Sequence, residues 1–275
     1  MAREWTTAQL AERSISKKYR KEIWNPFIAA VKRYALIQAG DKIAVCISGG
    51  GASMLLAKAL QLLQRFSETP FSLIFLLMDP GRSPADRRLA EENADALGIP
   101  LTVIEIDVSD TAEPTEEGPC SPCAPVLREQ AYRRARALGC NKIALGHHFT
   151  DVIETALGSM LYSAKLQGMM PKVRSGDCPG VEWIRPLFCV REEDILAWQR
   201  YNQLSFPQRA CPLPGTTAQP DAMREEIKAL IRDMKKRHPD VEQCIFSSLH
   251  SVCLDTFPEY SHHGVKHSFL EAYDD

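Results

Sequence analysis

Two kinds of hydrophobic spacing alternate along the chain and predict alternating strands and helices. Short, nearly continuous apolar runs of strand length occupy residues 43–47, 71–78, 101–106 and 142–145. Apolar positions at the spacing of a helix fill the intervening residues 53–66, 84–98 and 125–138. Continuous apolar runs are typical of strands buried on both faces, as in a parallel sheet. The pattern therefore predicts an α/β fold with a doubly wound parallel sheet.

Helical patterns also flank this predicted core on both sides. Residues 1–40 combine an apolar face with a basic side, and residues 192–201 and 221–237 are amphipathic, with a small β element expected near 181–184. Residues beyond 260 show no periodicity. The predicted organisation is a helical lead-in, an α/β domain carrying a C-x-x-C insertion, a C-terminal helical segment and a flexible tail, over residues 1–40, 41–206, 207–260 and 261–275.

Composition and charge place the chain among ordinary globular proteins. It has 275 residues, of which 45% are hydrophobic and 25% charged, with a formal net charge of -2. That balance gives no overall attraction to nucleic acid, but two basic clusters are local exceptions, each either a solvated helix face or a nucleic-acid contact. They comprise Arg13, Lys17, Lys18, Arg20 and Lys21, and then Arg133, Arg134 and Arg136.

Targeting patterns are missing from this sequence, and its cysteines do not suggest a disulfide framework. No run of eighteen apolar residues occurs, and the first ten residues resemble neither a signal nor a transit peptide. Nine cysteines at irregular spacing favour reduced thiols, some of them ligands. We therefore expect a cytoplasmic protein.

A glycine-rich turn joins the first strand to its helix at residues 48–53, which read SGGGAS. Backbone N–H groups exposed by such a turn, at the positive end of a helix dipole, suit an anion and above all a phosphate. The turn is neither a Walker A loop nor a dinucleotide-binding fingerprint. The alternative is a tight strand-to-helix turn without a ligand.

A single C-x-x-C pair, Cys120 and Cys123, follows an acidic segment rich in proline and glycine. Such a pair can bind zinc, form a redox couple, hold a cluster or be incidental. No second C-x-x-C follows, so a four-cysteine zinc site has little support. Spacing alone does not choose a further ligand among the remaining cysteines.

From about Arg13 to Pro258 the sequence resembles the tRNA 2-thiocytidine biosynthesis enzymes, which are iron–sulfur members of the PP-loop ATP pyrophosphatases. The matching segments are Ser48-Gly49-Gly50 with Ser53, Cys120-x-x-Cys123, Leu145-Gly146-His147-His148, Lys165-x-x-Gly168-Met169-x-Pro171-Lys172, Ile184-Arg185-Pro186-Leu187, and Cys211 followed by a basic helix. The resemblance implies a fold like that of the adenine nucleotide alpha hydrolases, with helical N- and C-terminal additions.

The resemblance also implies the reaction and its residues. Relatives consume ATP, giving AMP and pyrophosphate, and thiolate a cytidine in the tRNA anticodon loop. The implied ATP site comprises Ser48, Gly49, Gly50, Gly51, Ser53, Met78, Asp79, Gly146 and His147. Asp151 is an implied catalytic residue beside Mg²⁺. The implied ligands of a [4Fe-4S] cluster, catalytic as well, are Cys120, Cys123 and Cys211, which leave one iron open for exogenous sulfide.

Implied partners follow from the same resemblance. Lys165, Lys172 and Arg185 are expected to contact tRNA. The sulfur would come from a donor such as a cysteine desulfurase or from free sulfide. A homodimer is also implied.

Several positions depart from the pattern of these relatives. Gly51 replaces a lysine, Ala52 an aspartate, and Thr150 the first of two aspartates; Pro214 stands where relatives often carry another cysteine. Lost carboxylates weaken the hold on a magnesium ion that neutralises departing pyrophosphate. Two alternatives therefore remain: a catalytically impaired homologue that binds cluster and tRNA without ATP turnover, and a PP-loop desulfurase or sulfurtransferase acting on a small molecule.

Overall fold

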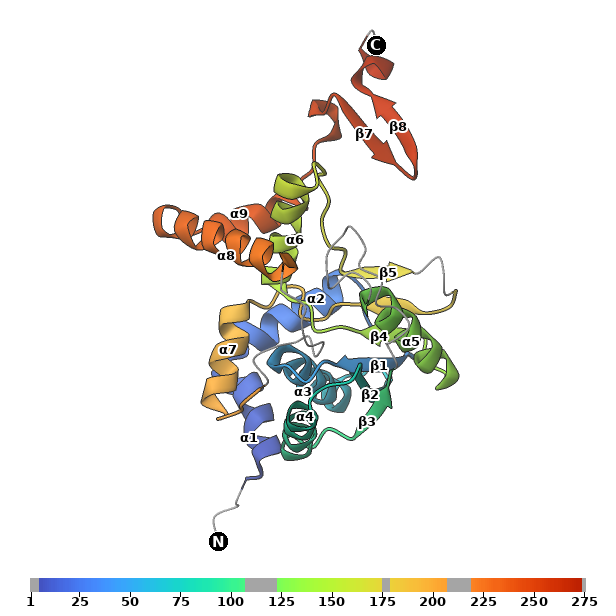
Figure 1. The fold of residues 1–275 in the computed structure, drawn as a ribbon, viewed down its shortest axis with the longest axis vertical. Helices are drawn as coiled ribbons and strands as arrows, with labels where there is room; N and C mark the ends of the chain where they lie inside the picture. Colours follow the sequence, from blue (N-terminus) through green and yellow to red (C-terminus); the bar gives the residue numbers. More distant parts are fainter. Residues whose placement is uncertain (1–4, 107–122, 175–178, 207–218, 274–275) are drawn as a thin grey trace. The chain divides into compact units, whose positions relative to one another are not determined.

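The computed structural model describes residues 5–106, 123–174, 179–206 and 219–273 (Figure 1). Its contacts divide the chain into two compact units, Met1–Ile227 and Lys228–Asp275. Cys120 and Cys211 lie outside the described residues. No helix in the described ranges is long and apolar enough to cross a bilayer.

A six-stranded sheet in the order β3-β2-β1-β4-β6-β5 forms the centre of the first unit. Its strands are β1 (Lys42–Ile47), β2 (Ser72–Asp79), β3 (Leu101–Glu105), β4 (Lys142–Ala144), β5 (Lys172–Arg174) and β6 (Glu182–Ile184). Ile43 in β1 pairs with Leu73 on one side and Lys142 on the other, both in parallel. Only β5, which the hydrophobic pattern did not predict, runs antiparallel to its neighbour in this sheet. The predicted doubly wound parallel sheet is confirmed.

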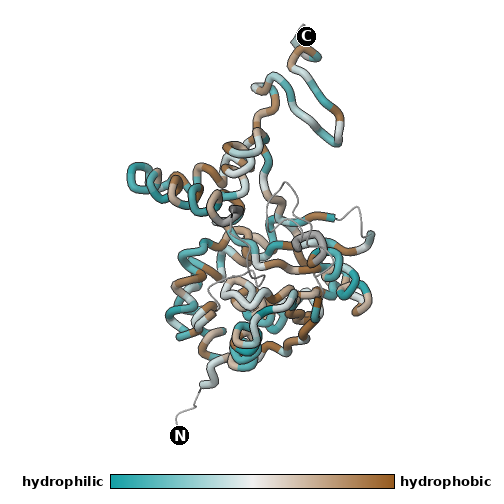
Figure 2. The backbone as a smooth tube through the Cα atoms, viewed as in Figure 1, coloured by the Kyte–Doolittle hydropathy of each residue, from teal (hydrophilic) through white to brown (hydrophobic). Residues whose placement is uncertain are grey.

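Helices cover both faces of this sheet because alternate strand residues point to opposite sides. They are α3 (Gly51–Phe66) and α4 (Pro84–Ala96) on one face and α5 (Cys123–Ala137) on the other; α6 (Phe149–Tyr162) follows β4, and α7 (Glu192–Tyr201) packs against α3. Ile43, Val45 and Ile47 join the core beneath α3, whereas Ala44 joins the core beneath α5. Figure 2 shows the resulting contrast between apolar strands and more hydrophilic outer helices.

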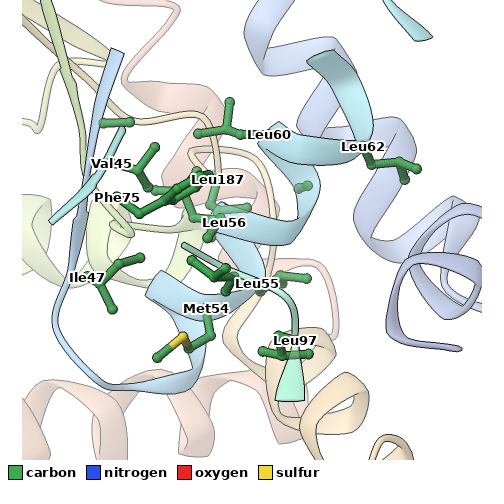
Figure 3. Packing of buried hydrophobic residues seen from close by; sticks show 14 of the residues in the cluster. Val45, Ile47, Met54, Leu55, Leu56, Leu60, Leu62, Phe75, Leu97 and Leu187 are labelled. Atoms are coloured by element: carbon green, nitrogen blue, oxygen red, sulfur yellow. The ribbon is translucent and has the colours of Figure 1, made fainter. Parts of the chain in front are cut away.

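The larger core lies between the sheet and α3. Val45 and Phe75 from the strands face Leu55 and Leu56 from the helix, all of them at most 3% exposed (Figure 3). This burial fixes the start of α3 relative to the end of β1. The glycine-rich turn between them is therefore held by packing on both sides.

The N-terminal helices belong to this same core. They are α1 (Thr7–Arg13), two π-helical segments (Ser14–Lys18 and Arg20–Trp24) and α2 (Asn25–Arg33). Ala11, Ile15, Ile23 and Phe27 are fully buried in the cluster that contains α3. The predicted lead-in thus completes one face of the α/β domain and shares its hydrophobic core.

A hairpin near the C-terminus corrects one prediction. The second unit contains α9 (Val241–Ser248), β7 (Glu259–His262) and β8 (Val265–Ser268), after the helix α8 (Gln219–Arg237). β7 and β8 pair antiparallel over residues 259–268, which overlap residues 261–275, where absent periodicity predicted a flexible tail. His263 and Gly264 both have positive φ, at 49° and 79°, as a two-residue hairpin turn requires. The two-residue turn and the cross-strand stack of Tyr260 on His267 support this hairpin, whose strands carry no hydrophobic pattern.

A buried ion pair ties α1 to α3 and generates a stability prediction. The Lys58 side chain is 2% exposed, and its Nζ lies 2.8 Å from Glu12 Oε1. Glu12→Leu removes the partner of a buried charge, so it should lower the free energy of unfolding by about 3 kcal/mol. The double variant Glu12→Leu/Lys58→Met should recover most of that loss, measured by urea unfolding.

Arg65 supplies the control for this prediction. Its guanidinium also pairs with Glu12, at 2.8 Å, but its side chain is 56% exposed. Arg65→Leu should therefore cost less than about 1 kcal/mol. If Glu12→Leu and the double variant lost equal free energies of unfolding, the cost would not come from the unpaired buried charge of Lys58.

Candidate functional site

The glycine-rich turn lies where the sheet changes direction. From β1 the chain winds outward through β2 and β3, and then returns to place β4 on the other side of β1. Ligands of doubly wound folds bind in the crevice at such a switch point, beyond the carboxyl ends of the strands. The segments after β1 and β4 meet there.

Gly146 brings these two segments into contact. A Cβ built on Gly146 would lie 3.2 Å from Ser53 N and 3.3 Å from the carbonyl carbon of Ala52. Both atoms are backbone and cannot move aside, so a side chain at position 146 would push the β4 segment away from α3. The structure thus brings Gly146 and the turn together, two predicted parts of one site.

Two serines brace the turn internally. Ser53 Oγ accepts a hydrogen bond from Ser48 N at 3.1 Å and donates to Gly50 O at 2.8 Å. Ser48 Oγ accepts from Gly50 N at 3.4 Å, and Gly49 has a φ of +76° that favours glycine. In the described chain, no side chain caps the N-terminus of α3. The turn is therefore preformed, and the positive end of the helix dipole faces the site.

Gln199 occupies the space beside Gly51. A Cβ on Gly51 would lie 1.7 Å from Gln199 Nε2 and 2.2 Å from its Cδ. Gln199 comes from α7 and was not among the residues that the sequence singled out. Its half-buried amide fills the place that a side chain at position 51 would take. Glycine at 51 and glutamine at 199 are thus a complementary pair.

Met78 and Asp79 end β2 beside the turn. Met78 is 8% exposed and packs in the core beneath α5. Asp79 Oδ1 accepts hydrogen bonds from Gly81 N at 3.1 Å and Arg82 N at 2.8 Å. Arg87 Nη1 lies 3.6 Å from Asp79 Oδ2. Asp79 therefore holds the turn after β2, and a contact with adenosine remains a prediction for both residues.

Asp151 is engaged at the start of α6. His148 N donates to Asp151 Oδ2 at 2.8 Å, which caps the helix. Arg224 from α8 pairs with Asp151 Oδ1 and also with Glu154 Oε2. Burial raises the pKa of Asp151, but the neighbouring His148 and Arg224 outweigh it and lower the pKa overall. Asp151 is therefore an ionised carboxylate that already pairs with the Arg224 guanidinium.

The neighbours of Asp151 complete this cluster. Burial lowers the pKa of His147 to about 4, so its ring is neutral at physiological pH, and its Nδ1 has no hydrogen-bond partner among the described residues. Thr150 Oγ1 accepts a hydrogen bond from Glu192 N at the start of α7. A structural role thus accounts for threonine at the position where the sequence lost an aspartate.

The three predicted RNA contacts differ in their surroundings. Lys165 is exposed. Lys172 Nζ donates to Ala35 O at 3.2 Å. Arg185 is half-buried and donates to Met170 O; burial, and then the charge of Arg128, lower its pKa, while Asp151 opposes that shift. Arg185 therefore belongs electrostatically to the cluster around His147 and Asp151.

A basic hollow of about 490 Å³ lies where the N-terminal helices meet the end of α7. Lys18 Nζ lies 3.8 Å from the centroid of the Tyr201 ring, which is 51% exposed. No acidic residue is among the described side chains that line it. They are Thr7, Leu10, Arg13, Ser14, Lys17, Lys18, Tyr201, Asn202 and Gln203. The sequence identified the basic cluster but missed the tyrosine and the amides, which come from a distant segment.

The side chains of the three predicted cluster ligands lie outside the described part of the structure. Cys120 and Cys211 are not described, and Cys123 begins α5 with a side chain that is not described either. Among the described side chains, no three of the His, Cys, Asp and Glu type form a metal-binding group. Free thiols occur at Cys46, Cys140, Cys189, Cys244 and Cys253. Burial raises the pKa of the Cys46 thiol to about 12, which makes it unreactive.

Comparison with known proteins gives matches over most of the chain. Residues 16–210 match the family model of the PP-loop domain. A tRNA-cytidine(32) 2-sulfurtransferase of Neisseria meningitidis serogroup C is 34% identical over 250 residues, covering 90% of this chain and 76% of that protein. One from Vibrio vulnificus is 32% identical over 254 residues, covering 90% and 80%.

One solved structure supports the fold. The U34-tRNA thiolase NcsA from Methanococcus maripaludis, solved with its [4Fe-4S] cluster, superposes with a TM-score of 0.66. The match covers 86% of this chain and 80% of that one, at 18% sequence identity. At that identity the likeness concerns the α/β architecture alone.

The complementarity of Gly51 and Gln199 is testable by substitution. Gly51→Lys forces the flexible end of the Gln199 side chain out of its place, so it should lower the melting temperature by a small amount. Adding Gln199→Ala should restore most of the loss, because the new side chain then has room. Differential scanning fluorimetry measures both effects.

Gln203 provides a matched control, since it lines the basic hollow and does not contact Gly51. Gln203→Ala should leave the loss caused by Gly51→Lys unchanged. If Gln199→Ala restored no more stability than Gln203→Ala, the steric pairing would be refuted.

Proposed function

Because this chain belongs to the tRNA-cytidine(32) 2-sulfurtransferase family of PP-loop proteins, we propose that it thiolates a tRNA cytidine in an ATP-dependent reaction. The observation that carries the proposal is the close approach of Gly146 to the glycine-rich turn at the switch point. That approach supports a nucleotide site built from the turn, the start of α3 and the β4 segment. We assign ATP binding to Ser48, Gly49, Gly50, Gly51, Ser53, Met78, Asp79, Gly146 and His147.

The proposed chemistry has two steps. Cytosine O2 attacks the α-phosphate of ATP, a bond from O2 to phosphorus forms, and the bond to pyrophosphate breaks. Sulfide then attacks C2 of the activated base, and AMP leaves with the former O2. The N–H groups of the turn and the dipole of α3 hold the phosphates, and the target base must leave its stack to reach them.

The cofactor proposal rests on the chemistry of three cysteine thiolates. Cys120, Cys123 and Cys211 form a donor set that suits an iron–sulfur cluster. The U34-tRNA thiolase NcsA, which shares the α/β architecture, was solved with such a cluster, and this supports the proposal. Cys120, Cys123 and Cys211 would hold the cluster, which would supply an open iron for sulfide. The sulfide would come from a cysteine desulfurase or from solution.

The candidate ligands of Mg²⁺ are less suited to their ion than the cysteines are to a cluster. Ala52 offers no carboxylate, and both Asp79 and Asp151 lie beside arginines. These residues do not provide a dedicated Mg²⁺ site in the described structure. We therefore propose that Mg²⁺ enters with the ATP phosphates, which are its usual ligands in such sites. Asp151 is then a candidate ligand only if Arg224 releases it.

The basic hollow supports tRNA as the macromolecular substrate. Three cations around an exposed tyrosine offer phosphate pairing and base stacking together. Lys165 and Lys172 extend the proposed contacts, and Arg185 would act nearer the reaction centre. We further propose that the protein works in the cytoplasm as a homodimer.

A second candidate function is tRNA binding without ATP turnover. Two features favour it. Ala52 has no carboxylate to bind Mg²⁺, and the carboxylate of Asp151 already pairs with Arg224. The same fold could also act on a small molecule, which loss of tRNA binding would indicate.

Pyrophosphate release distinguishes these functions. Anaerobically purified, cluster-loaded protein with ATP, sulfide and bulk tRNA should release pyrophosphate and form 2-thiocytidine. A variant carrying Gly51→Lys, Ala52→Asp, Thr150→Asp and Gln199→Ala is assayed beside it. Activity confined to the variant would contradict the proposal and leave tRNA binding as the function.

Cluster dependence has its own readout in this assay. Cys211→Ala should abolish 2-thiocytidine formation and retain pyrophosphate release, because adenylation needs no sulfide. Cys253→Ala changes an exposed free thiol and should alter neither product. Thiolation by Cys211→Ala at the unmodified rate would exclude this cysteine as a ligand.

Binding in the basic hollow should depend on salt. Lys17→Ala should weaken tRNA binding and reduce the slope of log K against log salt by about 1, the value for one lost phosphate contact. Lys32→Ala removes an exposed charge of α2 outside the hollow and should change the slope less. Filter binding between 50 and 200 mM salt, roughly the range over which such contacts weaken, gives both slopes. Equal slopes for the two variants would exclude the hollow.

A further inference from the structure

A buried arginine lies against the glycine-rich turn and has no role in the site described so far. Arg82 is in the connection between β2 and α4. A Cβ built on Gly49 would lie 3.4 Å from Arg82 Nη1 and 3.9 Å from its Cζ. The Arg82 side chain is only 6% exposed. A guanidinium is therefore packed beside a backbone turn whose geometry suits phosphate.

Asp79 fixes the position of this arginine. Asp79 Oδ1 accepts the Arg82 N–H at 2.8 Å, and Arg82 Nε lies 4.0 Å from the same oxygen. The carboxylate is itself 5% exposed. Backbone and side chain of Arg82 are thus both held by one buried acid at the carboxyl end of β2. Little rotamer entropy remains to be lost when the guanidinium meets a ligand.

The turn needs a charge that its own residues do not supply. The segment SGGGAS contains no cation, and a neutral amide from Gln199 fills the space beside Gly51. Burial keeps the nearby His147 ring neutral at physiological pH. A helix N-terminus contributes only about half a unit charge, far less than a polyphosphate carries. A guanidinium offers a full charge and paired donors that match phosphate oxygens.

We propose that Arg82 binds a phosphate of ATP and supplies the positive charge that the turn lacks, with Asp79 as its positioning residue. This inference rests on the proposed ATP site and adds to it a residue from the β2–α4 connection. Toward the phosphates, Asp79 then acts through Arg82, in addition to the contact with adenosine proposed above. In the proposed site the glycine-rich turn provides backbone N–H donors, and the β2–α4 connection provides a positive charge.

Equilibrium binding tests the assignment. Competition against a fluorescent ATP analogue gives affinities for ATP and for adenosine, which shares the base and ribose but carries no phosphate. Arg82→Met should weaken ATP binding by roughly tenfold to a hundredfold, as expected for a lost charge-assisted contact. Adenosine affinity should stay unchanged. Arg82→Lys retains the charge and should fall between the unmodified protein and Arg82→Met.

Arg88 provides the matched control. It is exposed on α4, so Arg88→Met makes the same chemical change away from the turn and should leave ATP affinity unaltered. Asp79→Asn should lower ATP affinity relative to adenosine affinity in the unmodified background, but should not lower that ratio further in Arg82→Met. That non-additivity separates positioning from a structural effect of Asp79.

The outcomes also separate this inference from the proposed function. If the unmodified protein bound adenosine but not ATP, or neither, the ATP site itself would be refuted. If it bound ATP and Arg82→Met bound equally well, Arg82 would have no phosphate contact and the inference alone would fail. Equal losses of ATP and adenosine affinity in Arg82→Met, with a lowered melting temperature, would assign Arg82 a structural role and overturn the inference as well.

Discussion

The close approach of Gly146 to the first turn of α3 is the constraint on which this site depends. With only 3.2 Å between Ser53 N and a hypothetical Cβ at 146, the segments after β1 and β4 are as near as two backbones pack. This contact closes the switch point of the sheet around the glycine-rich turn. Burial of Leu55 from α3 and Ala144 from β4 in the shared core holds both sides of the contact in place.

The side chains around the turn come from elsewhere in the chain. Gln199 from α7 fills the space beside Gly51, and Arg82 from the β2–α4 connection lies against Gly49. Thr150 anchors the start of α7 through Glu192 N. Gly51 and Thr150, two of the positions that depart from the family pattern, therefore have local explanations in packing and hydrogen bonding. They need not be read as simple losses.

The segment after β4 places one ionised and one neutral side chain at the crevice. Asp151 is ionised and paired with Arg224, while His147 is buried and neutral. This arrangement disfavours a dedicated metal ion at Asp151, because the carboxylate already pairs with Arg224. The basic hollow formed by the N-terminal helices and Tyr201 offers a further surface for a polyanion.

The sequence by itself determined the α/β fold, the order of its main elements and the family, all of which are confirmed. Apolar runs of strand length and a glycine-rich turn are local signals, so they can be read without a structure. The ATP, RNA and cluster residues remain predictions, and Cys120 and Cys211 lie outside the described residues. The hairpin at 259–268 was missed because its two-residue turn and ring stack leave no hydrophobic period. Only the tertiary structure decided that Gln199 and Arg82 lie beside the glycine-rich turn and that Tyr201 lines the basic hollow. Such contacts join segments far apart in the chain, and no local pattern encodes a distance between them.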